Sequence, residues 1–152
     1  MTADPDICVI TPTVRNPEFI EEYVRNANRN AFDTDRLFVL MVTEDFCEKD
    51  EMQDLLDRLG VEGAVFGGSE REAWYDEHGV SAYSDVVPAA SHAETSFGLL
   101  YMWARPEFEY GVFLDDDTAP HPESDFFGTH IEQLGTTRTI EHVASDQQWV
   151  NV

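Results

Sequence analysis

Hydrophobic positions along the chain alternate between short continuous runs and longer stretches with helical spacing. Residues 7–10 and 37–42 are apolar at every position, which is typical of strands buried on both faces of a parallel sheet. Helical spacing follows each run, over residues 19–27 and 52–59, and Gly60 stands where a left-handed helix end is expected. This alternation indicates βαβ units. It predicts an α/β fold with a Rossmann-like, mostly parallel sheet flanked by helices.

The second half of the chain continues the pattern less regularly. Residues 64–66 predict a short strand, and Ser69 with Glu72 resembles a capping box for a helix that Gly79 would end. Residues 80–90 predict a loop. Further elements are expected at residues 91–104 (helix), 110–114 (strand), 126–134 (helix) and 143–152 (a weak strand pattern).

Composition adds a strong acidic bias. The chain has 31 Asp and Glu against 9 Lys and Arg, a formal net charge of −22 at pH 7, and Lys49 is its only lysine. Such a surface repels nucleic acid and anionic membranes, so neither is expected as a partner. An acidic excess with almost no lysine is typical of halophilic cytosolic proteins, because concentrated salt screens repulsion beyond about 3 Å at 1 M. An acidic mesophilic protein is the alternative.

The sequence also bears on location and redox state. No stretch approaches the roughly 20 consecutive apolar residues of a membrane helix, and residues 1–6 do not resemble a signal segment. We therefore expect a cytoplasmic protein whose residues 1–152 form a single domain. Cys8 and Cys47 lack metal-ligand spacing and are expected as small core residues, without a disulfide in a reducing cytosol. Three tryptophans are expected in the core or an interface: Trp74, Trp103 and Trp149.

Three consecutive aspartates, Asp115, Asp116 and Asp117, directly follow the strand expected at residues 110–114. They would lie at the carboxyl edge of the sheet, where open α/β folds bind ligands. Like charges about 4 Å apart repel by roughly 4 kcal/mol at an effective dielectric near 20, so a bound cation would stabilise the cluster. Carboxylates suit Mg²⁺ or Mn²⁺, which bridge to phosphate oxygens. The run predicts a divalent metal held against a diphosphate; an exposed acidic loop is the alternative.

Sequence motifs over most of the chain carry a family resemblance. Residues 9–16, Val-Ile-Thr-Pro-Thr-Val-Arg-Asn, and residues 19–23, Phe-Ile-Glu-Glu-Tyr, form one motif. Residues 97–101 with the strand and aspartates of 110–117 form another, and residues 130–134 fit as well. Together they resemble the reversibly glycosylated polypeptide family, which includes UDP-arabinopyranose mutases. The resemblance implies the nucleotide-sugar-binding half of a GT-A type glycosyltransferase, a UDP-sugar and a divalent metal, Mn²⁺ or Mg²⁺.

Carried over by position, the resemblance also implies roles for individual residues. Asp115 and Asp117 would hold the metal, while Asp116 and Asp117 would act in catalysis by stabilising the departing diphosphate. Arg15 could instead pair with surface carboxylates. The residues implied to line the nucleotide pocket are Thr11, Pro12, Thr13 and Arg15.

Four further polar residues are candidates for substrate binding. Glu44 and Asp45 end the second expected strand and could accept hydrogen bonds from uracil or ribose. They could equally begin a helix, where acidic residues favour the dipole. His92 and Ser96 open the helix after the long loop and could approach the sugar or phosphate, or cap that helix.

The sequence therefore predicts a metal-dependent UDP-sugar-binding glycosyltransferase or mutase-like protein, with no nucleophile identified and a homo-oligomer as a further expectation. The family's self-glycosylated arginine lies downstream in a segment without a counterpart here, and the domain is expected to be incomplete at its C-terminus. The alternative is a truncated, non-catalytic module that binds a nucleotide-sugar or a partner chain. A phosphatase-like hydrolase would need an Asp nucleophile where residues 11–13 read Thr-Pro-Thr.

Overall fold

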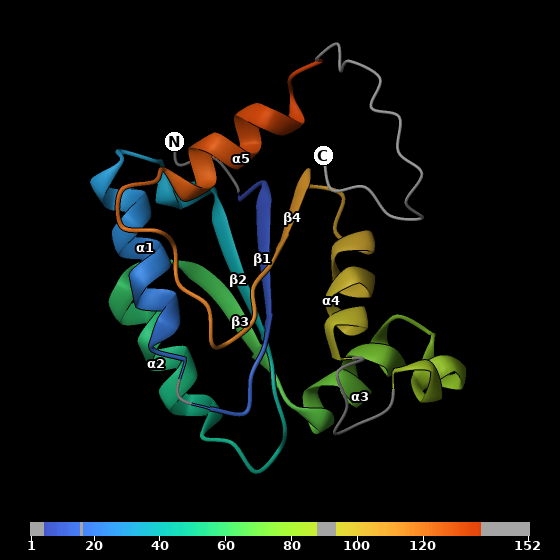
Figure 1. The fold of residues 1–152 in the computed structure, drawn as a ribbon. Coiled ribbons are helices and arrows are strands. Elements are labelled where there is room, and N and C mark those ends of the chain that lie inside the picture. The colour runs from blue at the N-terminus through green and yellow to red at the C-terminus, as the bar shows by residue number, and fades with distance from the viewer. Residues whose placement is uncertain (1–4, 16, 88–93, 138–152) are drawn as a thin grey trace, which may run out of the picture.

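A four-stranded parallel sheet forms the centre of the protein (Figure 1). The computed structural model describes residues 5–15, 17–87 and 94–137. Every pair of neighbouring strands in the sheet is parallel. The fold is thus α/β with a Rossmann-like sheet flanked by helices, which confirms the prediction. Along the sheet the strands lie in the order β3 (Glu62–Phe66), β2 (Leu37–Val42), β1 (Ile7–Pro12) and β4 (Tyr110–Phe113).

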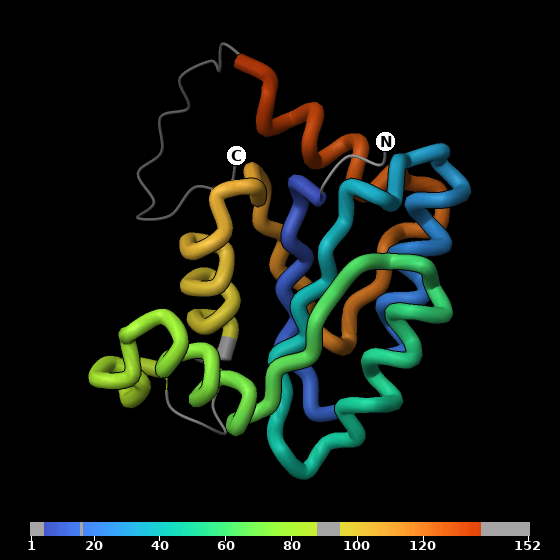
Figure 2. The backbone as a smooth tube through the Cα atoms, turned by 180° about the vertical axis from the view of Figure 1, so that it is seen from behind, coloured from blue at the N-terminus to red at the C-terminus, as the bar shows by residue number. Residues whose placement is uncertain are grey.

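Helices cover both faces of the sheet, as Figures 1 and 2 show. One face carries α1 (Phe19–Arg29), α2 (Lys49–Leu59) and α5 (Phe126–Leu134). The other carries α3 (Gly68–Glu77) and α4 (Glu94–Trp103). Two short 3₁₀ segments complete the described elements: η1 (Thr34–Arg36) and η2 (Ser81–Val86).

Successive side chains of a strand point to opposite faces, and this divides the core into two clusters. Ile7 and Val9 pack with α1, α2 and α5, whereas Cys8 and Ile10 pack with α3 and α4. All four are buried, so the continuous apolar run in the sequence follows from burial on both sides. Gly98 allows α4 to approach β1 closely, because a Cβ atom there would collide with Ile10 Cγ2.

The strand order reverses at β1. From β1 the chain moves outward through β2 to β3, and it then returns to add β4 on the free side of β1. The carboxyl ends of β1 and β4 therefore lie side by side at the point where the strand order reverses, which is the switch point where doubly wound sheets bind ligands. Thr13 and Leu114 directly follow these two strand ends.

Several predicted boundaries need correction. β3 begins at Glu62, two residues early, and η2 occupies part of the segment expected as a loop. The capping interaction at α3 involves Glu70, not Glu72: Glu70 Oε2 accepts a hydrogen bond from the backbone N–H of Gly67 at 2.9 Å. The predicted helix ends at Gly60 and Gly79 are confirmed, since both have a φ near +70°, at +68° and +67°. Residues 143–152, the weak strand pattern, lie outside the described residues.

Both cysteines are free, as the sequence predicts. Burial raises the pKa of the Cys8 thiol to about 12, so Cys8 is a core residue without thiolate chemistry. Cys47 is half-buried against the α1–α2 side of the core. Within the described ranges, no helix has the length and apolar character needed to cross a membrane.

Candidate functional site

The candidate site lies at the switch point between β1 and β4. Thr13 Oγ1 donates a hydrogen bond to Asp116 Oδ2 at 2.9 Å, joining residues that are 103 positions apart. Thr13 is buried, and its hydroxyl oxygen also accepts the backbone N–H of Arg15 at 3.1 Å. One threonine hydroxyl therefore ties the middle aspartate of the Asp run to the turn that follows β1.

Arg15 points to the same carboxylate. Its Nη1 atom lies 3.7 Å from Asp116 Oδ1, and the two side chains are 69% and 18% exposed. An ion pair this exposed contributes at most about 1 kcal/mol. The arginine thus keeps a largely solvated guanidinium next to a well-fixed carboxylate.

The other two aspartates face solvent. After Leu114, which is buried, the chain makes a turn in which the backbone N–H and the hydroxyl of Thr118 both donate to the carbonyl of Asp115, at 3.2 and 2.7 Å. Asp115 and Asp117 are exposed on this turn, while Asp116 is turned inward. Among the described residues, no three or more His, Cys, Asp or Glu side chains gather as a ready-made metal cage.

Helix α1 holds the segment that leaves the Asp run. Tyr23 Oη and Thr118 Oγ1 are hydrogen-bonded at 3.0 Å. One turn further on, the fully buried Asn26 donates to the carbonyl of Ser124 at 2.7 Å, and Arg29 donates to the carbonyl of Pro122 at 2.7 Å. The segment from residue 118 to 125 is therefore fastened along α1, which fixes the position of the aspartates from behind.

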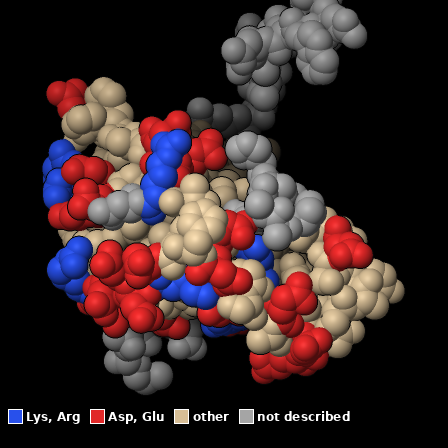
Figure 3. Space-filling view, turned by 90° about the horizontal axis from the view of Figure 1, so that it is seen from below, with Lys and Arg blue, Asp and Glu red and all other residues tan. Residues whose placement is uncertain are grey.

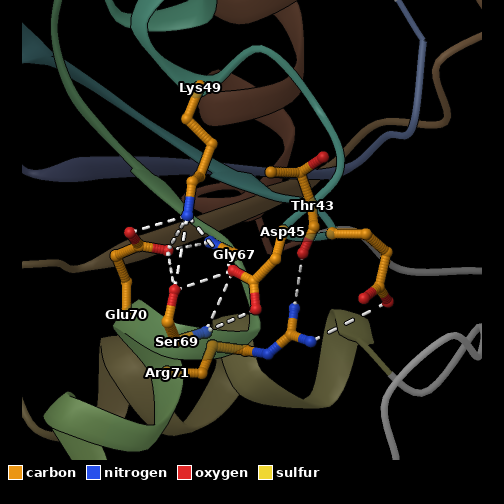
Figure 4. Close-up of polar contacts among 8 residues, drawn as sticks. Thr43, Asp45, Lys49, Gly67, Ser69, Glu70 and Arg71 are labelled. Carbon is orange, nitrogen blue, oxygen red and sulfur yellow. Dashed lines mark hydrogen bonds and ion pairs between the residues drawn. The ribbon is translucent and has the colours of Figure 1, made fainter.

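Asp45, which follows the carboxyl end of β2, binds the first turn of α3 (Figure 4). Both of its carboxylate oxygens lie 3.1 Å from the backbone nitrogen of Ser69 in the first turn of α3, and Oδ1 also accepts from the Ser69 hydroxyl at 2.8 Å. Lys49 Nζ lies 3.1 Å from the same oxygen. The Ser69 backbone and hydroxyl donors, followed by Lys49, lower the pKa of Asp45 to about 2. The structure places Asp45 as a cap for α3.

Glu44 lies beside a buried arginine. Arg71 on α3 is 4% exposed, and its Nη1 donates to the carbonyl of Thr43 at 2.9 Å. Its Nη2 lies 3.9 Å from Glu44 Oε1. Figure 4 shows the arginine reaching from α3 to the strand end. The carboxyl end of β2 is thus fastened to α3 through Thr43 and Glu44, and the sequence pattern gave no signal for Arg71.

The remaining candidate residues for substrate binding are Thr11, Pro12, Ser96 and His92. Thr11 Oγ1 is fully buried at the end of β1 and lacks a hydrogen-bond partner within the described part of the chain. Pro12, the last residue of β1, is half-buried. Ser96 is exposed in the first turn of α4. His92 lies outside the described residues.

A hollow of about 480 Å³ opens next to Arg15, between the β1–α1 connection and α2. Pro17, Met52 and Leu55 are buried residues in its lining, and Arg58 borders it together with several acidic side chains. Figure 3, which looks onto the carboxyl edge of the sheet, shows acidic and basic groups crowded on the α1–α2 side. The hollow has the size of a small-molecule site and shares Arg15 with the Thr13–Asp116 contact.

Thr13, Arg15 and Asp116, which the sequence motifs imply for one site, are in contact in the structure. The roles of Asn26 and Tyr23 are not predicted by the sequence pattern, because their partners come from a segment almost a hundred residues away. The only available signal for Asn26 was a polar residue on the apolar side of α1. Compared with known proteins, the sequence matches no family model and no curated protein.

Proposed function

We propose that this protein binds a nucleotide-sugar of the UDP-sugar class at the β1–β4 switch point, in a metal-dependent manner, as a glycosyltransferase or mutase-like protein. The proposal depends above all on the hydrogen bond between Thr13 and Asp116. This contact joins the turn after β1 to the Asp run, the two motifs that carry the family resemblance. A ligand at this place would meet both of them at once.

The donor atoms suit a divalent ion that is shared with a phosphate. Asp115 and Asp117 are exposed carboxylates on one turn, so they would hold the ion, while Asp116 is engaged by Thr13. Mg²⁺ and Mn²⁺ are commonly bound through one or two carboxylates, with waters and substrate phosphates completing the coordination. When bound, such an ion would offset the charge that develops on a leaving diphosphate.

The chain's own residues would orient the ligand. Arg15 presents a solvated guanidinium beside Asp116, which suits a phosphate oxygen. The neighbouring hollow offers buried apolar residues for the nucleoside, and its volume is within the usual range for small ligands. The hold of α1 on residues 118–125 keeps the aspartates in place before any ligand arrives.

Isothermal titration with UDP, with and without Mn²⁺, tests the proposal. We expect binding that requires the metal and weakens at least about tenfold in Asp117→Asn and in Thr13→Val, since each loses one charged or polar contact. The matched controls are Asp35→Asn at η1 and Thr129→Val on α5, both exposed and remote from the sheet's carboxyl edge. UDP binding that is equally tight with and without Mn²⁺, and equally tight in Asp117→Asn and the wild type, would contradict the assignment of the aspartates as metal ligands.

A second measurement separates an enzyme from a non-catalytic binding module. The wild-type protein is incubated with UDP-sugars and Mn²⁺, and both the release of UDP and the conversion of each UDP-sugar into an isomer are followed over time. Release of UDP that is abolished in Asp117→Asn supports a transferase, and isomerisation that is abolished in the same variant supports a mutase-like enzyme. Metal-dependent binding with neither reaction supports the binding module.

A further inference from the structure

Phe46 is an exposed aromatic residue on a turn whose backbone is well fixed. Its side chain is 77% exposed, in the connection between β2 and α2 at the carboxyl edge of the sheet. The backbone N–H of Cys47 donates to the carbonyl of Glu44 at 3.0 Å, which closes the turn around Phe46. The preceding residue, Asp45, is hydrogen-bonded to Ser69 of α3 (Figure 4), and the following one, Cys47, packs against the core. The fold therefore presents this ring to solvent on an ordered backbone.

The ring of Phe46 borders the hollow of about 480 Å³ that opens next to Arg15. Val14, which is 51% exposed in the connection between β1 and α1, borders it as well. Two exposed apolar side chains from two separate connections thus line one hollow, an arrangement that suits an apolar, flat part of a ligand. The buried apolar residues of the same lining are Pro17, Met52 and Leu55.

The charged residues of the hollow decide which part of a ligand fits inside it. The lining includes two arginines, Arg15 and Arg58, and four acidic residues: Glu18, Glu48, Glu51 and Asp54. This excess of carboxylates repels a phosphate, whereas a ribose hydroxyl or the N–H of a base can donate to a carboxylate. Arg15 also reaches Asp116, so a phosphate fits best at the Arg15 end. The hollow itself suits an uncharged aromatic group with hydroxyl donors, which describes a nucleoside.

We propose that Phe46 stacks on the base of the nucleotide, with the nucleoside in the hollow and the diphosphate at the Arg15 end; this rests on the proposed function and adds a binding residue to it. Every base has a π face, so stacking on Phe46 supplies affinity and orients the plane of the base without selecting one base over another. Because the backbone of the turn is already ordered, binding restricts little more than the rotation of the ring.

Isothermal titration with UDP and with inorganic pyrophosphate, each with Mn²⁺, tests the proposal, because only UDP carries a base. Phe46→Ala should weaken UDP binding by about tenfold or more, the usual effect of losing one base–aromatic stack, and should leave pyrophosphate binding unchanged. Phe46→Tyr keeps the ring and should bind UDP within about twofold of the wild type. Tyr83→Ala on η2 is the matched control, since Tyr83 is 69% exposed and lies outside the lining of the hollow; it should leave both ligands unaffected.

Cys47 provides an independent readout of the hollow. The sequence has two cysteines, and Cys8 is buried with a thiol pKa raised to about 12, whereas Cys47 is half-buried and lines the hollow. N-Ethylmaleimide should therefore react at Cys47. UDP at about ten times its dissociation constant should slow this reaction about tenfold, since only the unoccupied hollow reacts. Pyrophosphate should not slow it.

The outcomes separate the role of Phe46 from the metal site. UDP binding that requires Mn²⁺ and Asp117 but is equally tight in Phe46→Ala and the wild type would overturn the stacking residue alone. So would bound UDP that leaves Cys47 fully reactive. UDP binding that is independent of Mn²⁺ but weakens in Phe46→Ala would support the stacking residue and contradict the metal site. A wild-type protein that does not bind UDP at about 1 mM would overturn both. Circular dichroism verifies that each variant is folded.

Discussion

The backbone N–H of Phe126 donates a hydrogen bond to Asn26 Oδ1 at 3.1 Å, so a side chain buried in α1 fixes the first residue of α5. The amide nitrogen of Asn26 donates at the same time to the carbonyl of Ser124 at 2.7 Å. One side chain thus satisfies two backbone groups in the segment that connects the Asp run with α5. The position of Asp116 therefore depends on residues that touch no candidate ligand.

Replacing the side chain of Asn26 should destabilise the folded protein. We expect Asn26→Ala to lower the free energy of unfolding by about 2 kcal/mol, because the half-buried backbone N–H of Phe126 loses its side-chain partner and the carbonyl of Ser124 keeps only the donor from Asn30. Urea denaturation in concentrated KCl measures the change. The matched control is Asn28→Ala, on the exposed side of the same helix, which should change stability by no more than about 0.5 kcal/mol. Equal losses in the two variants would contradict the role assigned to Asn26.

The contact between α4 and β1 makes a prediction about glycine. Gly98→Ala should destabilise the protein by about 1–3 kcal/mol, because the added methyl group would overlap Ile10 and force the helix away from the strand. Helix propensity alone would stabilise the alanine by about 1 kcal/mol, so the sign of the change is diagnostic. Gly135→Ala, where a Cβ meets nothing closer than 3.7 Å, is the control and should be neutral or slightly stabilising. A more stable Gly98→Ala variant would mean that α4 packs less closely.

The cap formed by Asp45 predicts a dependence on pH. The backbone and hydroxyl donors of Ser69, followed by Lys49, lower the pKa of Asp45 in the folded protein from 3.8 to about 2. The ionised carboxylate therefore contributes stability above pH 3.8, and this contribution is lost as the pH falls toward 2.

Urea denaturation across this range of pH measures the effect. Asp45→Asn should lose stability less steeply with falling pH than the wild type, because it has no carboxylate to protonate at the cap. Asp50→Asn, an exposed residue in the first turn of α2, should follow the wild-type slope. Identical slopes for Asp45→Asn and the wild type would exclude the cap as a source of the pH dependence.

The charge of the chain predicts a dependence on salt. We expect the melting temperature to rise by at least about 5 °C between about 0.1 M and 2 M KCl, because salt screens repulsion among the carboxylates. Thermal unfolding followed by circular dichroism gives the value. A near-neutral α/β protein measured in parallel corrects for the general effect of salt on hydrophobic burial. A fully folded protein in dilute buffer, with no further gain from KCl, would count against the halophilic interpretation.

The parts of the fold that follow from local rules were predictable from the sequence. β1 and β2 are buried on both faces, so their apolar runs are unbroken. α2 ends at Gly60 because a φ of +68° favours glycine, and the predicted bounds of α5 match the structure. In each case the signal lies within a few residues of the feature.

Features that join distant segments could be predicted only in part. That Thr13 and Asp116 lie at the same sheet edge follows from the alternation of strands and helices, but their contact requires β4 to add beside β1. Periodicity does not encode strand order. The place of Asp45 after a strand predicts a ligand-binding residue, whereas its partner in the structure, Ser69, is brought there by the packing of α3. Asn26 gave little signal in the sequence and Arg71 gave none, because the partners of both lie in distant segments.

Lys49 is a site for selective chemical labelling. Its ammonium group lies 2.7 Å from Glu70 Oε2 and 3.1 Å from Asp45 Oδ1, at the junction of α2 and α3. These contacts raise the pKa of the lysine, with the hydrogen bond to Glu70 as the largest cause. Because Lys49 is the only lysine of the sequence, an amine-reactive dye that attaches to a lysine side chain attaches at this junction. The acylation rate of this side chain would therefore report on its ion pairs with Glu70 and Asp45.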